Sequence, residues 1–175
     1  ELLLQELDEN DAYYAPLKTI HQSGVKAAAI VQDLLTLTRR GVVITETVNL
    51  RDILLDYLGS VEFANLRSFS PDIEFRQEID DNLMNIKGSY HHLSKCIMNL
   101  VTNAVEALPE GGIVLIKAKN GYVDKPFGKY DDVEEGEYVI LSVEDNGAGI
   151  SKEDLSKIFE PFYTTLRARG GTGLG

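Results

Sequence analysis

The sequence has almost no cysteine and lacks tryptophan entirely. Cys96 is the only cysteine among 175 residues, so the chain can form neither an internal disulfide nor a zinc site built from several cysteines. A single thiol is typical of a reducing compartment, and we therefore expect a cytoplasmic location. Because Cys96 falls within an apolar helical pattern, we interpret it as a small core residue rather than a reactive thiol.

Long apolar runs and an excess of positive charge are also absent. No segment approaches the roughly 20 apolar residues that a membrane helix needs, and no charged-then-apolar secretory signal opens the chain. We expect residues 1–175 to make no membrane contact, although a longer parent protein could carry an anchor. The formal net charge of -11 argues against nucleic-acid binding, but Mg²⁺ and a few backbone N–H groups could still hold a nucleotide.

Residues 1–41 differ from the rest of the chain because a helical seam runs through them. Pro16 can begin a helix, since its missing N–H is not needed in the first turn. Small and apolar residues then follow at spacings of three and four. They are Leu17, Ile20, Gly24, Ala27, Val31, Leu34 and Thr38, with Ala28 and Leu35 beside them. Gly41 is a stop signal, and residues 1–8 resemble the end of an earlier helix. The pattern predicts part of an antiparallel helical hairpin that packs against other helices.

Residues 42–175 alternate between strand and helix patterns. Asn49, Ser89 and Ser151 can each cap a helix, and the three helices are expected to end near residues 59, 108 and 158. Predicted strands cover 42–48, 73–79, 113–122 and 138–144, with a hairpin loop over 125–136. The fold class that follows is α+β: a two-layer α/β sandwich, with a mixed or antiparallel sheet and helices on one face.

The helix that Ser89 caps carries two stripes of different character. The expected core stripe is Leu93, Ile97, Leu100 and Ala104. Asn99, Asn103 and Glu106 are spaced four and three apart, so they share another face. Asparagine is a mediocre helix former, so two on one stripe call for an explanation, and ligand binding would provide one. Taken alone, however, the stripe does not favour a binding role. A solvated polar face is the simpler alternative.

Three further segments are rich in glycine or aromatic residues. Residues 145–150 (Asp-Asn-Gly-Ala-Gly-Ile) follow a predicted strand, where glycines permit unusual backbone angles and close approach of a ligand. Residues 159–165 (Phe-Glu-Pro-Phe-Tyr-Thr-Thr) come next, and residues 170–175 (Gly-Gly-Thr-Gly-Leu-Gly) could turn several N–H groups towards a phosphate. Each segment alone is a weak signal, because a strand-ending turn or a loose loop would explain it equally well.

In this order and at these separations, the segments resemble the histidine-kinase branch of the ATPase superfamily shared with gyrase, heat-shock chaperone and mismatch-repair ATPases. Residues 99–107 resemble its asparagine box, 145–150 its first glycine box, 159–165 its phenylalanine box and 170–175 the start of its second glycine box. The seam helix resembles the second helix of the dimerisation and histidine-phosphotransfer domain. The resemblance implies a Bergerat-type ATP-binding fold. Residues 1–41 would be a partial phosphotransfer hairpin, and residues 42–175 a catalytic ATP-binding domain that stops within its last glycine box.

The resemblance also implies roles for single residues. Asn103 would coordinate Mg²⁺ through its amide oxygen, with Asn99 supporting the metal and phosphates. In hydrolysing relatives the turn of Asn99 carries a glutamate base that activates water, and an asparagine there could not act as that base. Asp145 would accept a hydrogen bond from the adenine amine, where guanine has a carbonyl oxygen. Gly147 and Gly149 would let the chain pass close to the base and sugar.

A lid over the phosphates is implied for residues 151–172. The remaining positions implied at the ATP site are Glu106, Ile150, Phe159, Phe162, Thr164, Thr165, Gly171, Thr172, Gly173, Leu174 and Gly175. Leu166 departs from the family pattern, in which a lysine often follows the paired threonines. Arg167 or Arg169 could supply that positive charge instead.

The phosphoacceptor histidine of this family is followed at once by an acidic residue. The chain has three histidines, His21, His91 and His92, and none precedes Asp or Glu, so all three are expected to be structural. The implied activity is that of a protein-histidine kinase in two-component signalling. It would transfer the ATP γ-phosphoryl to a histidine upstream of Glu1, for relay to an aspartate of a response-regulator receiver domain.

A homodimer through the helical segment is also implied. Two alternatives stay open: a nucleotide-dependent conformational ATPase of the same superfamily, and a catalytically degenerate ATP-binding scaffold.

Overall fold

The computed structural model describes residues 3–4, 7–8, 11–38, 46–124, 133–160 and 163–164. The chain divides into two compact units. The first contains Glu1–Val42 and Glu153–Leu174, and the second contains Val43–Lys152. Among the described residues, none of the helices is long and apolar enough to cross a membrane.

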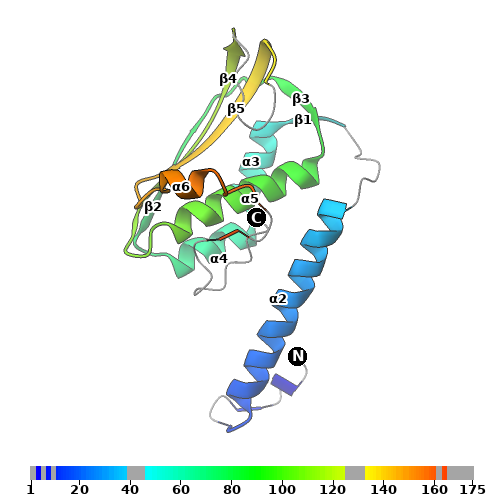
Figure 1. The fold of residues 1–175 in the computed structure, drawn as a ribbon, viewed down its shortest axis with the longest axis vertical. Coiled ribbons are helices and arrows are strands. Elements are labelled where there is room, and N and C mark those ends of the chain that lie inside the picture. The colour runs from blue at the N-terminus through cyan, green and yellow to red at the C-terminus, as the bar shows by residue number, and fades with distance from the viewer. Residues whose placement is uncertain are drawn as a thin grey trace. The chain divides into compact units, whose positions relative to one another are not determined.

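The first unit is built around one long helix, α2 (Tyr14–Thr38), drawn in blue in Figure 1. It begins two residues before Pro16, after a turn in which the backbone N–H of Tyr13 donates to Asp11 Oδ1 at 2.8 Å. Ile20 and Val31 of the predicted seam are 68% and 55% exposed. The packing of a second helix against this seam therefore stays a prediction.

The strands of the second unit form two hydrogen-bonded sets. β1 (Glu46–Asn49) pairs antiparallel with β3 (Asn85–Gly88). The larger sheet has the order β2-β4-β5, with β2 (Ile73–Ile79) parallel to β4 (Gly112–Val123) and β5 (Gly136–Asp145) antiparallel to β4. This mixed sheet confirms the predicted fold class.

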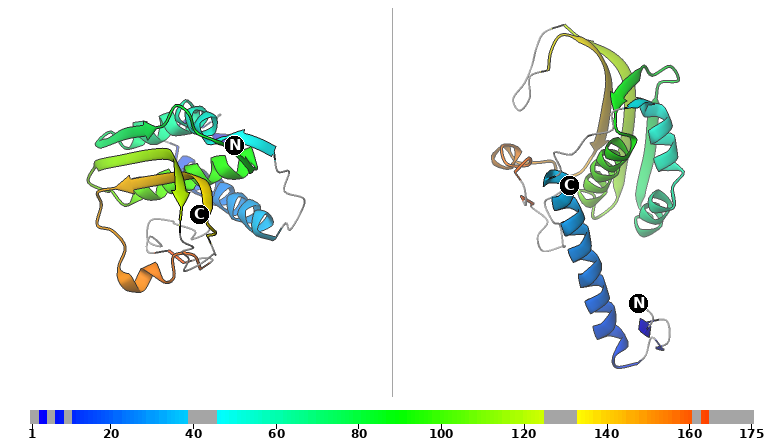
Figure 2. Two further views of the ribbon diagram at one scale, coloured as in Figure 1. Left: turned by 90° about the horizontal axis from the view of Figure 1, so that it is seen from above. Right: turned by 90° about the vertical axis from the view of Figure 1, so that its right-hand side faces the viewer.

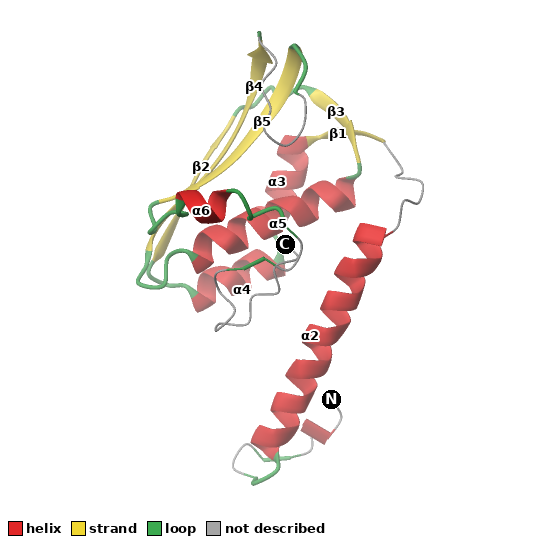
Figure 3. Cartoon of the chain, viewed as in Figure 1, coloured by secondary structure: helices red, strands yellow, loops and turns green. Residues whose placement is uncertain are grey.

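Three helices, α3 (Leu50–Leu58), α4 (Val61–Phe69) and α5 (Tyr90–Glu106), lie on one face of the β2-β4-β5 sheet (Figures 2 and 3). Asn49 caps α3 by accepting a hydrogen bond from Arg51 N at 2.9 Å, and Ser89 caps α5 by accepting from His92 N. Both caps were predicted, and each satisfies a backbone donor that a helix start leaves open. The sequence patterns did not predict α4 or β3.

The core fills the space between this sheet and its helices. Val114, Ile116 and Ala118 alternate along β4 and are at most 1% exposed, so they face the helices. Facing side chains on α5 come from Ile97 and Val101, both fully buried. Further buried members are Leu50, Ile53, Leu54, Tyr57, Phe63, Leu83, Ala104 and Leu108.

Two sequence predictions about α5 were wrong. Leu100 is 39% exposed, and Val101 takes the place expected for it in the core. Cys96 is exposed rather than buried. The reason is the same for both. The buried stripe runs through Ile97 and Val101, which are four residues apart. Cys96 and Leu100 each come one residue earlier, so their side chains are turned about 100° away from that stripe.

Burial of Tyr57 predicts a loss of stability at high pH. Desolvation raises the pKa of Tyr57 to about 12, whereas an exposed tyrosine titrates near pH 10. The resulting stabilisation is complete below pH 10 and is lost as the pH rises through about 12, because the unfolded chain releases the proton first. Raising the pH from 9 to 11 should lower the free energy of unfolding in both proteins. The decrease should be larger in the wild type than in Tyr57→Phe by about 1 kcal/mol. Denaturant titrations at both pH values measure this difference, and equal losses in the two proteins would contradict it.

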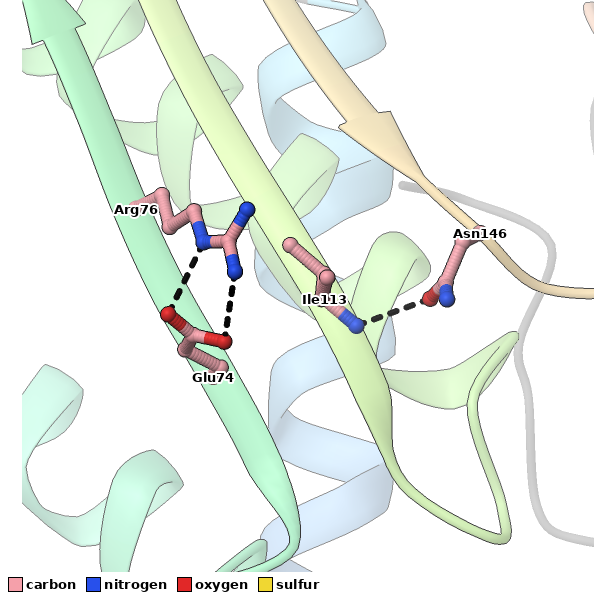
Figure 4. Close-up of polar contacts among 4 residues, drawn as sticks. All are labelled: Glu74, Arg76, Ile113 and Asn146. Carbon is pink, nitrogen blue, oxygen red and sulfur yellow. Dashed lines mark hydrogen bonds and ion pairs between the residues drawn. The ribbon is translucent and has the colours of Figure 1, made fainter.

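β2 lies at one edge of the sheet and carries charge on the face turned away from the helices. Arg76 forms a two-pronged ion pair with Glu74, with Nε 2.8 Å from Oε1 and Nη2 2.9 Å from Oε2 (Figure 4). Both side chains are more than half exposed, so the pair adds little to stability. The alternate residues Ile73, Phe75 and Ile79 pack against the core.

Candidate functional site

The asparagine-bearing face of α5 is accessible. Asn103 and Glu106 are exposed and Asn99 is half-buried, while Ile97, Val101 and Ala104 face the core. The predicted separation into a core stripe and a polar stripe is therefore confirmed, although the core stripe has a different member at Val101. A row of accessible amides and a carboxylate can offer oxygen ligands or hydrogen bonds to a bound molecule.

Residues 146–149 form a tight loop directly after Asp145, the last residue of β5, and we call this segment the Asp145 loop. The backbone N–H of Gly147 donates to Asp145 Oδ1 at 2.8 Å, which folds the loop back on the aspartate. Asp145 is exposed, and no other hydrogen bond to its carboxylate is found among the described residues. Gly149 has φ 72°, a left-handed conformation that glycine adopts without strain, and a Cβ there would meet no atom within 4 Å.

This loop packs against the C-terminal end of α5. A Cβ added at Gly147 would lie 2.5 Å from the carbonyl oxygen of Ala107, the residue that caps the end of α5. Only glycine therefore allows this approach of the two backbones. The contact brings together two segments that the sequence analysis identified separately, the asparagine box and the first glycine box.

Asn146 makes a contact that sequence reasoning missed. Its Oδ1 accepts a hydrogen bond from the backbone N–H of Ile113 at 2.8 Å, as Figure 4 shows. A Cβ at Gly112 would lie 2.4 Å from the same oxygen, so this glycine leaves room for the amide. The Gly111-Gly112 pair was interpreted only as a turn, and nothing in the sequence pairs it with a residue about thirty positions later.

The other predicted site residues are exposed, half-buried or outside the described residues. Ile150 and Phe159 are 56% and 69% exposed, and Thr164 is half-buried. The helix predicted for 151–158 is shorter, with α6 covering Lys152–Leu155. The predictions outside the described residues concern Phe162, Thr165, Leu166, Arg167, Arg169, Gly171, Thr172, Gly173, Leu174 and Gly175.

The three histidines are separated between the two units. His91 and His92 are exposed in the first turn of α5, and His21 is half-buried on α2. Within the described part of the chain, no group of three or more His, Cys, Asp or Glu side chains is arranged to hold a metal ion. Among the described residues, exposed side chains of this region that carry oxygen atoms include Asn103, Glu106 and Asp145.

Known proteins resemble this chain in sequence and in fold. Residues 88–175 match the family model described as histidine kinase-, DNA gyrase B-, and HSP90-like ATPase. The whole chain is 34% identical to the sensor kinase CckA of Brucella abortus (strain 2308) and spans 18% of that protein's length.

Two solved structures share the fold. Histidine kinase ThkA in complex with the response regulator protein TrrA matches with a TM-score of 0.64 at 24% identity, over 91% of this chain and 43% of that one. Full-length ShkA in complex with AMPPNP matches with a TM-score of 0.65 at 22% identity, over 98% of this chain and 34% of that one. The family match over residues 88–175, half of the chain, means that the protein belongs to the histidine kinase-, DNA gyrase B- and HSP90-like ATPase family, and the relative that it matches along its whole length is a sensor kinase.

Proposed function

We propose that this chain binds ATP with Mg²⁺ and transfers its γ-phosphoryl group to a histidine outside residues 1–175. The observation that carries the proposal is the packing of the Asp145 loop against the end of α5, where Gly147 lies against the carbonyl oxygen of Ala107. It joins an exposed carboxylate to a helix face that offers the amides of Asn99 and Asn103. A nucleotide needs both kinds of group, one for its base and one for its metal-bound phosphates.

Asp145 is the residue proposed to recognise adenine. Its Oδ1 already accepts the N–H of Gly147, so its Oδ2 is the oxygen offered to the adenine amine. A carboxylate accepts hydrogen bonds and donates none when ionised, so it favours an amine over the carbonyl oxygen that guanine has at that place. The left-handed backbone at Gly149, with open space where a side chain would be, suits close approach of the base and sugar.

Asn103 is proposed as the protein ligand of Mg²⁺, with Asn99 supporting the phosphate end. Mg²⁺ prefers six oxygen ligands, and phosphates and waters can provide most of them, so one neutral amide is a sufficient protein contribution. The metal would neutralise charge that develops on the phosphate oxygens. Asn99 cannot take a proton from water, which favours transfer to a side chain over hydrolysis. The chain's own task is then to position the phosphates and to stabilise their charge.

The acceptor histidine, the partner and the domain boundaries are parts of the same proposal. None of His21, His91 and His92 has an acidic neighbour on its C-terminal side that could take a proton during the transfer. We assign residues 1–41 to a dimerising phosphotransfer hairpin and residues 42–175 to the catalytic domain. The relay to a response-regulator aspartate is supported by ThkA, whose structure was determined with a response regulator. The cytoplasmic location stays a prediction.

Incubation with γ-labelled ATP and Mg²⁺ tests where the phosphoryl group goes. Residues 1–175 should bind ATP without acquiring acid-labile, base-stable phosphate on any histidine. A longer version, extended towards the N terminus with a His-Asp or His-Glu pair on the preceding helix, should become labelled. Stoichiometric label on His21 would refute the proposed location of the acceptor. A longer version that binds ATP but never becomes labelled would favour the degenerate scaffold.

A further inference from the structure

The Asp145 loop is attached to the rest of the second unit at two points. Gly147 lies against the Ala107 carbonyl at the end of α5. Asn146 is the other attachment, because its Oδ1 accepts the N–H of Ile113 on β4. Asp145 is the residue immediately before these two, so its main chain is held by strand pairing on one side and by these contacts on the other.

The Asn146 contact reaches a junction of three segments. β4 begins at Gly112, whose N–H donates to the carbonyl oxygen of Asp72 at 3.1 Å, just before β2. Asn146 occupies the space left by the missing side chain of Gly112 and bonds to the next residue, Ile113. Asp145, the last residue of β5, pairs with Val114 of β4. Asn146 lies one residue beyond the end of β5, and its side chain adds a further link to β4 there.

We propose that Asn146 is a positioning residue for nucleotide selection. By bonding Ile113 N–H, it fixes the loop so that the Asp145 carboxylate is held in one orientation before a base arrives. This inference rests on the proposed recognition of adenine by Asp145. An acceptor that is already fixed loses less conformational freedom on binding, and it discriminates better between an amine and a carbonyl because it cannot turn away from the wrong base.

The alternative is that the Asn146 hydrogen bond contributes only to stability. Asn120 provides a matched control within the same unit, on β4. Its Oδ1 accepts from Met84 N at 2.9 Å and its Nδ2 donates to the carbonyl oxygen of Asn82 at 2.7 Å. It is therefore another exposed asparagine that joins its strand to a neighbouring backbone, with no connection to the Asp145 loop.

The experiment measures the ratio of ATP to GTP affinity by calorimetry at pH 8, together with the melting temperature of each variant. Asn146→Ala should lower this ratio about fivefold, the change that corresponds to loss of one ordinary hydrogen bond. Asn146→Asp retains an oxygen acceptor for Ile113 N–H and should keep the ratio within about twofold, because the added charge affects both triphosphates alike. Asn120→Ala, which removes two hydrogen bonds, should lower the melting temperature at least as much as Asn146→Ala and leave the ratio unchanged. If Asn146→Ala does not fold, Asn146→Ser, whose hydroxyl is too short to reach Ile113 N–H, should show the same lowered ratio.

Several outcomes would overturn the positioning role of Asn146. An unchanged ratio in Asn146→Ala or Asn146→Ser, or an equal fall in Asn120→Ala, would overturn the positioning role while leaving the proposed function intact. Failure of Asn146→Asp to retain the ratio would also overturn it, since the acceptor oxygen would then not be what matters. A wild-type chain that binds ATP and GTP equally would refute the proposed recognition of adenine by Asp145, and the positioning role with it.

Discussion

Replacing Asn103 by alanine is expected to lower the affinity for ATP in the presence of Mg²⁺ by about 100-fold. Loss of groups that merely support a metal ligand commonly costs 10–100-fold in metal affinity, so loss of the ligand itself should reach about the upper value. In the presence of a chelator that removes Mg²⁺, the wild type and Asn103→Ala should bind ATP with almost equal affinity. The measurement is calorimetry under both conditions, and the effect lies in the Mg²⁺-dependent part of the affinity.

Stability provides the internal control for Asn103. Its side chain is exposed on α5 and alanine is the better helix former, so the melting temperature should not fall. Asn65→Ala is a matched control, because Asn65 is also an exposed asparagine on a helix, α4, and the change should leave ATP affinity unaltered. Retention of the full Mg²⁺-dependent affinity in Asn103→Ala would mean that Asn103 is not the metal ligand.

Asp145→Asn is expected to lower the affinity for ATP by about tenfold or more. A hydrogen bond to a charged group is worth about 1.5–3 kcal/mol, and a neutral amide in its place retains only part of that energy. The amide oxygen can still accept the N–H of Gly147, so the loop should keep its form. The introduced NH₂ group can donate to the carbonyl oxygen of guanine, and GTP affinity should therefore hold or rise.

Glu144→Gln makes the same chemical change one residue earlier, on the opposite face of β5. Glu144 forms an exposed ion pair with Lys117 at 3.0 Å, whose loss should cost little stability. Calorimetry of both variants with ATP and GTP should show that only Asp145→Asn loses the preference in affinity for ATP over GTP. Equal affinities of the unmodified chain for the two nucleotides, or an equal effect of Glu144→Gln, would contradict adenine recognition by Asp145.

Local sequence signals predicted the elements whose cause is local. Asn49 and Ser89 were identified as caps because a side-chain oxygen satisfies a backbone donor two or three residues away. Strand β2 was predicted from its alternation of apolar and polar residues. By contrast, α4 and β3 were missed. α4 has only Phe63 buried, and β3 is four residues long, so neither shows a strong periodic pattern.

Predictions that depended on tertiary contacts were less complete. The choice between Leu100 and Val101 for the core depends on a rotation of one residue about α5, which the facing β4 side chains decide. For the candidate site, helical spacing identified Asn99 and Asn103, and the resemblance to a glycine box identified Asp145. Neither could show that the Asp145 loop meets the end of α5 through Gly147. Asn146 was part of a motif without a role, because its partner at Ile113 is distant in sequence.

The charged side chains on β2 affect how this protein behaves at high concentration. In the described β2-β4-β5 order, β2 pairs only with β4, and its other backbone edge carries unpaired N–H and C=O groups that could template another chain. Glu74, Arg76 and Glu78 put three charged side chains on the exposed face of this seven-residue strand. A second strand aligned beside it would have to accommodate those charges, so the strand itself opposes edge-to-edge aggregation.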